Sequence, residues 1–146
     1  MVKTALLSII LLIFSCNSQK KMPETKNDEI NKLHDIWALK TLNGTKINRE
    51  EFVGQKRIPM LEIFIEEKRI SGNDSCNDLF GTIQLVDNSS IRFEKLGGTK
   101  MACPDMKLSY DYAKGLVQTK SYKLEKLHLY FYDSEGKELL KFIKVD

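Results

Sequence analysis

The residues of this chain that could carry covalent chemistry are few: three cysteines and two histidines among 146 residues. Cys76 and Cys103 could form a disulfide, could remain two reduced and packed thiols, or could act in redox or nucleophilic chemistry. A redox pair usually has Cys-x-x-Cys spacing at the start of a helix, whereas these two cysteines are far apart in the sequence. A nucleophilic cysteine needs a base, usually histidine, but His34 lies near the N-terminal segment and His128 in an expected strand. We therefore expect no catalytic residues and no enzymatic activity.

The composition gives no indication of a metal, a cofactor or a nucleic acid. Zinc needs four ligands at close spacing, and histidine and cysteine are too scarce here to supply them. The sequence contains no glycine-rich phosphate loop and no Gly-x-Ser-x-Gly nucleophile elbow. The net charge is only +3, and acidic and basic residues are mixed, as in residues 66–69. This mixture is typical of a solvated surface and not of a nucleic-acid interface.

The first 15 residues have the pattern of an export signal. Lys3 precedes an apolar run over residues 5–14, which is broken only by Ser8. A run of about ten residues is too short to span a bilayer but matches the core of a signal peptide. The run ends in Ile13-Phe14-Ser15-Cys16, which resembles the lipobox of bacterial lipoproteins. The alternatives are an ordinary signal peptide, or a buried strand with an incidental cysteine.

The lipobox resemblance implies that residues 1–15 are removed and that Cys16 is acylated. Two or three acyl chains would hold the protein to a membrane stably. Asn17 follows the cysteine, a pattern that in lipoproteins generally implies sorting to the outer membrane. We expect residues 16–34 to be the lipidated cysteine and a flexible tether, because they are polar and lack apolar periodicity. The expected partner is thus the membrane itself, and the expected location is the cell envelope.

Residues 35–146 are expected to fold as one mostly β domain of the α+β class. Eight short β-rich segments alternate with turn signals such as Asn43-Gly44 and Asp87-Asn88. They predict an antiparallel meander of about seven or eight strands, forming a curved sheet or partial barrel. The expected strands are 36–39, 60–65, 69–71, 82–86, 90–96, 121–124, 127–132 and 139–145. One helix is expected near residues 104–119, where Met106, Tyr110, Ala113 and Val117 follow helical spacing.

Three segments of this domain resemble motifs of the META (HslJ-like) family. The motif residues are Trp37 and Gly44 in the first segment, Gly72, Cys76, Asn77 and Gly81 in the second, and Thr99, Met101 and Cys103 in the third. Their order and spacing agree from Trp37 to the C-terminus. The resemblance implies that the two cysteine motifs lie side by side, and it suggests a stress-related role without a defined reaction. Ser75 stands where the family usually has glycine, so a left-handed backbone there would be strained.

An exported chain whose third cysteine is acylated is left with an even pair, which favours a Cys76–Cys103 disulfide. Closing that loop would stabilise the fold by about 3.5 kcal/mol in the chain-entropy treatment. We expect Asp74 and Asn77 to hydrogen-bond the backbone of their own loop. Met101 and Phe80 are expected in the core around the cysteines.

The leading functional hypothesis is a membrane-anchored, non-enzymatic binding or stress-protective module. Its partner could be an envelope protein or a glycan, bound for example on an exposed face carrying Tyr130 and Tyr132. A second hypothesis is a carrier of a small apolar ligand, enclosed by the curved sheet. A third is a thiol redox protein that uses Cys76 and Cys103.

Overall fold

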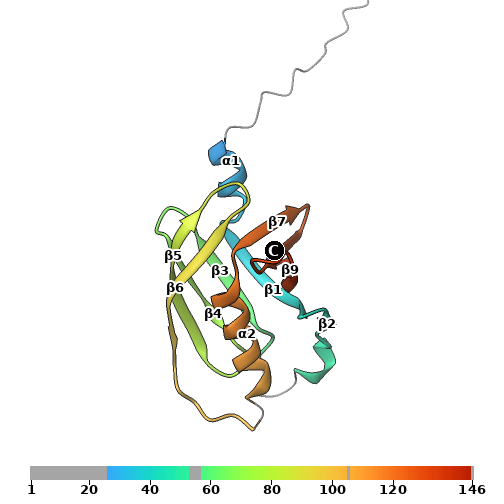
Figure 1. The fold of residues 1–146 in the computed structure, drawn as a ribbon. Helices are drawn as coiled ribbons and strands as arrows, with labels where there is room; N and C mark the ends of the chain where they lie inside the picture. The colour runs from blue at the N-terminus through green and yellow to red at the C-terminus, as the bar shows by residue number, and fades with distance from the viewer. Residues whose placement is uncertain (1–25, 53–56, 105, 146) are drawn as a thin grey trace, which may run out of the picture.

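The computed structural model describes residues 26–52, 57–104 and 106–145 (Figure 1). The expected signal peptide and the expected lipidation site, Cys16, lie outside the described residues. Within these described ranges, nine strands and two α-helices follow one another. They are α1 (Lys26–Asn31), β1 (Asp35–Leu42), β2 (Thr45–Lys46), a 3-10 turn (Arg49–Glu51), β3 (Met60–Phe64), β4 (Arg69–Asn73), β5 (Asp78–Val86), β6 (Ile91–Gly98), α2 (Lys107–Gln118), β7 (Ser121–Glu125), β8 (His128–Tyr132) and β9 (Glu138–Lys144).

All strands belong to one antiparallel sheet with the order β6-β5-β4-β3-β1-β9-β8-β7. Strands β3 to β6 pair consecutively as hairpins, and so do β7 to β9. Strand β1 lies between β3 and β9 and joins these two groups. Strand β2 pairs only with the last residues of β1, beyond the region that β3 covers. The expected mostly β, antiparallel, curved sheet is therefore confirmed. The structure has nine strands instead of seven or eight, because the Asn43-Gly44 turn starts the two-residue strand β2.

The sheet curves until its two edge strands meet at one end. Ser90 and Ser121 form an isolated antiparallel bridge between the start of β6 and the start of β7. The amide of Ile91 donates to the carbonyl of Lys120 at 3.2 Å, and the amide of Tyr122 donates to the carbonyl of Ser89 at 2.8 Å. Helix α2 packs against β6, β9 and β1 and covers the side that the half-barrel leaves open (Figure 1). The core lies between the helix and the concave face of the sheet.

Helix α2 confirms the expected helix, but the residues whose spacing indicated it do not form the buried face. Met106, Tyr110 and Val117 are 42%, 67% and 58% exposed. The buried residues are Ser109, Tyr112, Gly115 and Leu116. Gly115 determines this orientation, because it has no side chain and lets the helix backbone approach Leu140 of β9. None of the helices in the described ranges is long and apolar enough to cross a membrane.

Ordered structure begins before the expected boundary at residue 35. The segment predicted to be a flexible tether up to residue 34 contains α1 and the fully buried side chain of Leu33. The carbonyl of Leu33 also accepts a hydrogen bond from the indole nitrogen of Trp37 at 3.0 Å. Leu33 therefore belongs to the folded core and not to a flexible segment, as had been predicted for residues up to 34.

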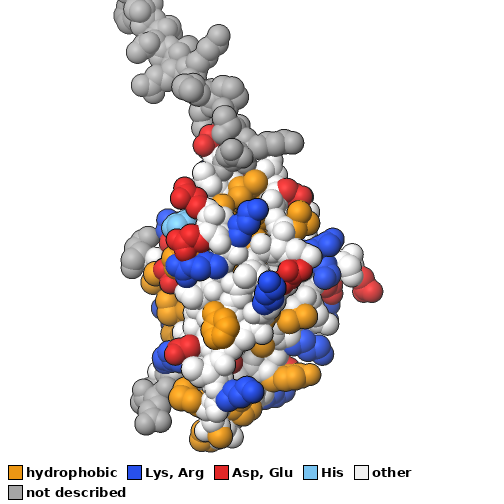
Figure 2. Space-filling view, turned by 90° about the vertical axis from the view of Figure 1, so that its left-hand side faces the viewer, with side chains coloured by type: hydrophobic (Ala, Val, Ile, Leu, Met, Phe, Trp, Pro, Cys, Tyr) orange, Lys and Arg blue, Asp and Glu red, His pale blue; other side chains and the backbone are white. Residues whose placement is uncertain are grey.

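The outer surface of the sheet carries charges of both signs. On the side of the molecule where β5 and β6 lie, acidic and basic side chains are interspersed with scattered hydrophobic ones (Figure 2). On β8, His128, Tyr130 and Tyr132 point outward and are half-buried, whereas Leu129 and Phe131 are buried. The predicted alternation of this strand is confirmed. The rings of Tyr130 and Tyr132 are nearly parallel, with centroids 6.4 Å apart, and Lys141 lies over the Tyr130 ring at 4.9 Å.

Candidate functional site

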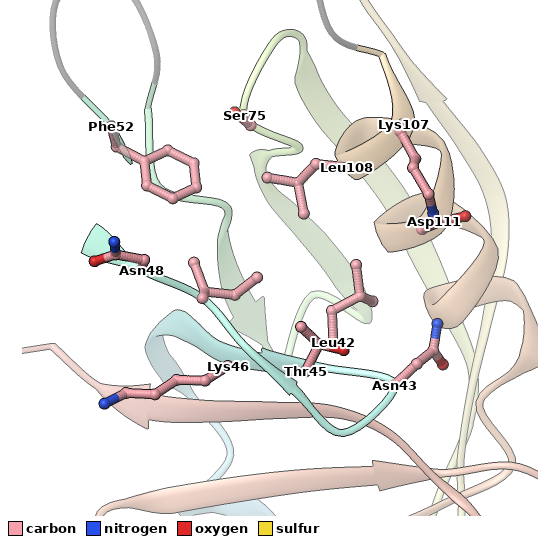
Figure 3. A pocket seen from close by; sticks show the side chains of 11 residues that line it. Leu42, Asn43, Thr45, Lys46, Asn48, Phe52, Ser75, Lys107, Leu108 and Asp111 are labelled. Carbon is pink, nitrogen blue, oxygen red and sulfur yellow. Dashed lines mark hydrogen bonds and ion pairs between the residues drawn. The ribbon is translucent and has the colours of Figure 1, made fainter. Parts of the chain in front are cut away.

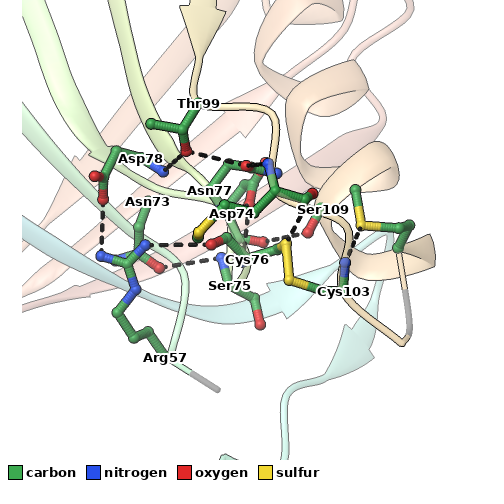
Figure 4. Close-up of a disulfide and its surroundings, with 12 residues drawn as sticks. Arg57, Asn73, Asp74, Ser75, Cys76, Asn77, Asp78, Thr99, Cys103 and Ser109 are labelled. Carbon is green, nitrogen blue, oxygen red and sulfur yellow. Dashed lines mark hydrogen bonds and ion pairs between the residues drawn. A yellow bond between two sulfur atoms is a disulfide. The ribbon is translucent and has the colours of Figure 1, made fainter. Parts of the chain in front are cut away.

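Cys76 and Cys103 form a disulfide, with their Cα atoms 6.1 Å apart (Figure 4). Cys76 lies in the loop between β4 and β5, and Cys103 lies in the segment between β6 and α2. Cys76 is buried and Cys103 is half-buried. The disulfide alternative of the three is thus the one found, and the two cysteine motifs lie side by side. Within the described part of the chain, no group of three or more His, Cys, Asp or Glu residues is placed to hold a metal ion.

The loop that carries Cys76 is held by its own side chains. The Asp74 carboxylate accepts hydrogen bonds from the amides of Cys76 at 2.9 Å and Asn77 at 2.6 Å. The Asn73 side chain accepts one from the amide of Ser75 at 3.0 Å. The expected role of Asp74, bonding the backbone of its own turn, is confirmed. Its carboxylate is therefore used for structure.

The side chain of Asn77 links the two motifs to each other. Its oxygen accepts hydrogen bonds from the Thr99 hydroxyl at 3.0 Å and the Met101 amide at 2.7 Å. The prediction that Asn77 bonds the backbone of its own loop is therefore wrong. The Thr99 oxygen in turn accepts one from the amide of Asp78 at 3.1 Å. Asn77 is buried, so each of these bonds replaces contact with water. This chain of bonds explains why threonine and asparagine stand beside the cysteines.

Arg57 belongs to the same cluster, although no sequence pattern predicts this. Its guanidinium forms an ion pair with Asp78 at 2.8 Å and donates to the carbonyl of Cys76 at 3.4 Å. Both members of the ion pair are substantially exposed, so the pair contributes little to stability. Arg57 lies 21 positions from Asp78, and no spacing rule for helices or turns connects the two.

Helix α2 contacts the loop that carries Cys76. The Ser109 hydroxyl donates to the carbonyl of Asp74 at 3.0 Å. The Tyr112 hydroxyl is fully buried and has no hydrogen-bond partner among the described residues. Burial raises the pKa of Tyr112 far above its ordinary value, and the negative charge of Asp74 adds to that effect. Tyr112 therefore stays neutral in the folded protein at any physiological pH.

The motif glycines allow close backbone packing. A Cβ atom on Gly72 would lie 2.0 Å from the carbonyl oxygen of Met60, on the neighbouring strand. On Gly81 it would lie 2.6 Å from a methyl carbon of Leu96. Gly44, with φ of +79°, completes the tight turn that Asn43 begins. Together with the buried Trp37, these residues have structural roles that account for their place in the motifs.

Two residues that we expected in the core lie on the surface. Met101 is 52% exposed and Phe80 is 57% exposed. Met101 contributes its backbone to the cluster through the bond to Asn77, and its side chain is not needed for that contact. Phe80 faces outward on β5 and packs across Gly97 of β6, where a Cβ atom would lie 2.8 Å from its ring. Neither side chain lies in the core around the disulfide.

Ser75 adopts a backbone conformation that side chains rarely take. Its φ is +88°, in the left-handed region that favours glycine. The predicted strain at this position is thus present. Such strain costs of the order of 1 kcal/mol and often accompanies a functional role.

A cleft of about 510 Å³ lies beside the disulfide loop (Figure 3). The elements that line it, β2 and the start of α2, lie away from α1 (Figure 1). Four apolar side chains line it, from β1, the segment after β2 and α2, and we call them the floor: Leu42, Ile47, Phe52 and Leu108. Its rim is polar and includes Ser75, Lys107 and Asp111. The concave face of the sheet is filled by a continuous core. The cleft borders this core, to which Leu42 also belongs, and is not the pocket enclosed by the sheet that a carrier was expected to have.

A half-barrel covered by one helix, with two cysteine motifs joined beside that helix, defines the structural class of the protein. The META domain profile matches residues 30–146, and the chain belongs to the META domain family. No curated protein matches the chain.

Three solved structures share the fold. An NMR structure of a protein from Burkholderia xenovorans has 20% sequence identity and a TM-score of 0.59, covering 99% of both chains. A second NMR structure has 23% identity and a TM-score of 0.57, covering 77% of this chain and 90% of the other. A crystal structure of a DUF4847 family protein from Bacteroides vulgatus has 13% identity and a TM-score of 0.55, covering 78% and 96%. At these identities the likeness concerns the fold alone.

Proposed function

We propose that the protein is an exported lipoprotein, held to the cell envelope through Cys16, whose META domain is a non-enzymatic binding or stress-protective module. The observation that carries the proposal is the use of the polar groups around the disulfide. Asp74 and Asn77 accept hydrogen bonds within the cluster, and the cysteines bond each other. No thiolate and no general base is provided there, so the cluster serves as a rigid scaffold.

A disulfide also fits the proposed location, because disulfides persist in oxidising compartments outside the cytosol. The membrane anchor follows from the lipobox-like sequence that ends at Cys16. An anchor of two or three acyl chains would keep a small domain at a membrane surface. The outer membrane is the proposed destination, because Asn17 follows the cysteine.

The anchor is tested by intact-mass analysis of the full chain expressed in a bacterium with a lipoprotein export system. We expect a mature chain that begins at Cys16 and carries the added mass of its acyl chains. A clickable palmitate analogue should label the wild-type protein but not the Cys16→Ala variant. The matched control is a variant with Cys76→Ser and Cys103→Ser, which should still be labelled. Equal labelling of the wild type and Cys16→Ala would refute the anchor.

The scaffold role is tested by thiol labelling of the same exported protein, with and without prior reduction. We expect Cys76 and Cys103 to be labelled only after reduction. Loss of the disulfide should lower the free energy of unfolding by about 2–5 kcal/mol, measured by urea denaturation. Rapid labelling of both thiols in the native protein would contradict the scaffold role and favour thiol chemistry instead.

A further inference from the structure

The cleft at the end of the half-barrel has the features of a ligand site. Phe52 lies after β2, and its ring faces Leu108 of α2 across the cleft (Figure 3). Further along the chain, Pro59 lies beside β1 again, where its carbonyl accepts a hydrogen bond from the amide of Leu39 at 2.9 Å. Ile47, Phe52 and Leu108 all remain partly exposed. Covering such apolar surface is favourable, so the cleft has a physical reason to be occupied.

The size and shape of the cleft favour a small molecule. Its volume of about 510 Å³ is typical of sites that hold metabolite-sized or drug-sized ligands. A stable protein partner would instead need a broad interface, of about 800 Å² on each side. Four apolar groups at the bottom of a concave site can enclose one ring or one branched aliphatic group.

The rim favours a negatively charged ligand. It carries two lysines, Lys46 and Lys107, against a single acidic residue, Asp111. Asp111 is already paired with Lys107 across one turn of α2. Lys46 is exposed and forms no ion pair with any described residue. The charge balance of the rim is therefore positive.

Ser75 supplies an independent indication of a ligand. Its strained φ of +88° would be relieved by glycine, yet serine places a hydroxyl at the edge of the cleft (Figure 3). Within the described part of the chain, this hydroxyl makes no hydrogen bond. Its side chain thus has no structural partner that would explain the strain, whereas a ligand at the cleft would give it one.

We infer that the cleft binds a small amphipathic anion. The aromatic or branched apolar body of the ligand lies against the four floor side chains. Its carboxylate or similar acidic group lies near Ser75 at the polar rim, whose charge balance is positive. This inference rests on the proposed binding function and names its ligand class. The disulfide loop then acts as one wall of the site, which connects the scaffold to the binding role.

The inference is tested with 2-naphthoate as the probe and 2-naphthylmethylamine as its cationic counterpart. Binding to the mature chain in lipid nanodiscs is measured by isothermal titration calorimetry, with empty nanodiscs as the blank. We expect saturable binding of 2-naphthoate that is at least about threefold tighter than that of the amine. Phe52→Ala should weaken it by about tenfold, because an aromatic side chain of the floor is removed. Phe80→Ala, which removes the same atoms from a side chain that is 57% exposed on β5, is the matched truncation and should leave it unchanged.

Two further variants test the charge of Lys46 and the hydroxyl of Ser75, and distinguish their effects on binding from a general loss of stability. Lys46→Glu should weaken 2-naphthoate binding by about threefold or more, whereas Lys114→Glu, the same change away from the cleft, should not. Ser75→Gly should leave the melting temperature equal or higher, because strain is relieved, and yet weaken binding by about threefold.

Equal affinity for the two probes, no binding of either, or unchanged affinity in Phe52→Ala would overturn the inference. None of these results affects the acylation and thiol-labelling tests. Failure of the ligand site and failure of the proposed function are therefore distinguishable.

Discussion

Gly115 of α2 lies directly against Leu140 of β9, and a Cβ atom on residue 115 would stand 3.1 Å from Leu140 Cγ. Alanine at this position would favour the helix by about 1 kcal/mol. Leu140 is fully buried and cannot move aside easily, and overpacking of a core costs about 1–3 kcal/mol. We therefore expect Gly115→Ala to lower the free energy of unfolding by about 1 kcal/mol, measured by urea denaturation.

The control for this prediction is a smaller side chain at position 140 of β9, facing residue 115. In a Leu140→Val background, Gly115→Ala should cost less than it does alone, or should even stabilise the domain. If Gly115→Ala stabilises the protein with Leu140 intact, close packing at this contact is not what orients the helix.

Asn77 is predicted to be the polar residue on which the paired motifs depend most. Asn77→Ala would leave the Met101 amide and the Thr99 hydroxyl without their acceptor. The expected loss of stability is about 1–3 kcal/mol. Hydrogen exchange should also become faster at the Met101 amide. Asn88→Ala, in the exposed turn between β5 and β6, is the matched control and should change neither quantity.

Leu33 is expected to contribute to stability as a core residue, although it precedes the first strand. Leu33→Ala should lower the free energy of unfolding by about 2–5 kcal/mol, as buried leucines usually do. Leu127→Ala removes the same atoms from a side chain that is 52% exposed, and should cost less than about 1 kcal/mol. Similar losses in the two variants would show that the segment before Asp35 is not part of the folded domain.

The buried tyrosines predict a loss of stability at alkaline pH. Burial, together with the negative charges of Asp87 and Glu29, raises the pKa of Tyr122 to about 12. The pKa of Tyr112 is raised as well, mainly by its burial. Since both values exceed that of an unfolded tyrosine, about 10, the contribution is complete below pH 10 and is lost as the pH rises toward 12.

This pH dependence can be followed through the ultraviolet absorbance of tyrosinate. Because their pKa values are raised by burial, Tyr112 and Tyr122 should ionise only as the protein unfolds. Tyr122→Phe should flatten the decline in stability between pH 10 and 12. An unchanged decline in that variant would contradict the assignment.

The sequence was informative where a local pattern has one structural outcome. Turn dipeptides and alternating strands predicted the antiparallel meander, and the spacing of the two cysteine motifs, through the family resemblance, placed them side by side. The helix was predicted for the right residues but with the wrong face. Two stripes at helical spacing were available, one through Tyr110 and one through Tyr112. Which stripe is buried depends on Gly115, because its backbone packs against Leu140. A pattern of hydrophobic residues does not reveal this contact.

The site was harder to predict because its parts meet only in three dimensions. The cleft combines residues from the turn after β1, the disulfide loop and the first turn of α2. No periodicity connects these segments. Phe80 and Met101 were expected in the core because they are apolar and stand close to the cysteines in the sequence. Instead, Phe80 occupies a position of β5 whose side chain faces outward, and Met101 lies in the segment after β6 with its side chain exposed.

The pairing of β1 with β9 has a consequence for how the protein is made. Strand β1 forms its ladder with β9, the last strand of the domain, so the two halves of the sheet cannot join until β9 has been synthesised. Contacts between positions so distant in the sequence slow folding. The complete sheet therefore forms only after β9 has been synthesised, and until then the group β3–β6 lacks the strand that joins it, through β1, to β7 and β8.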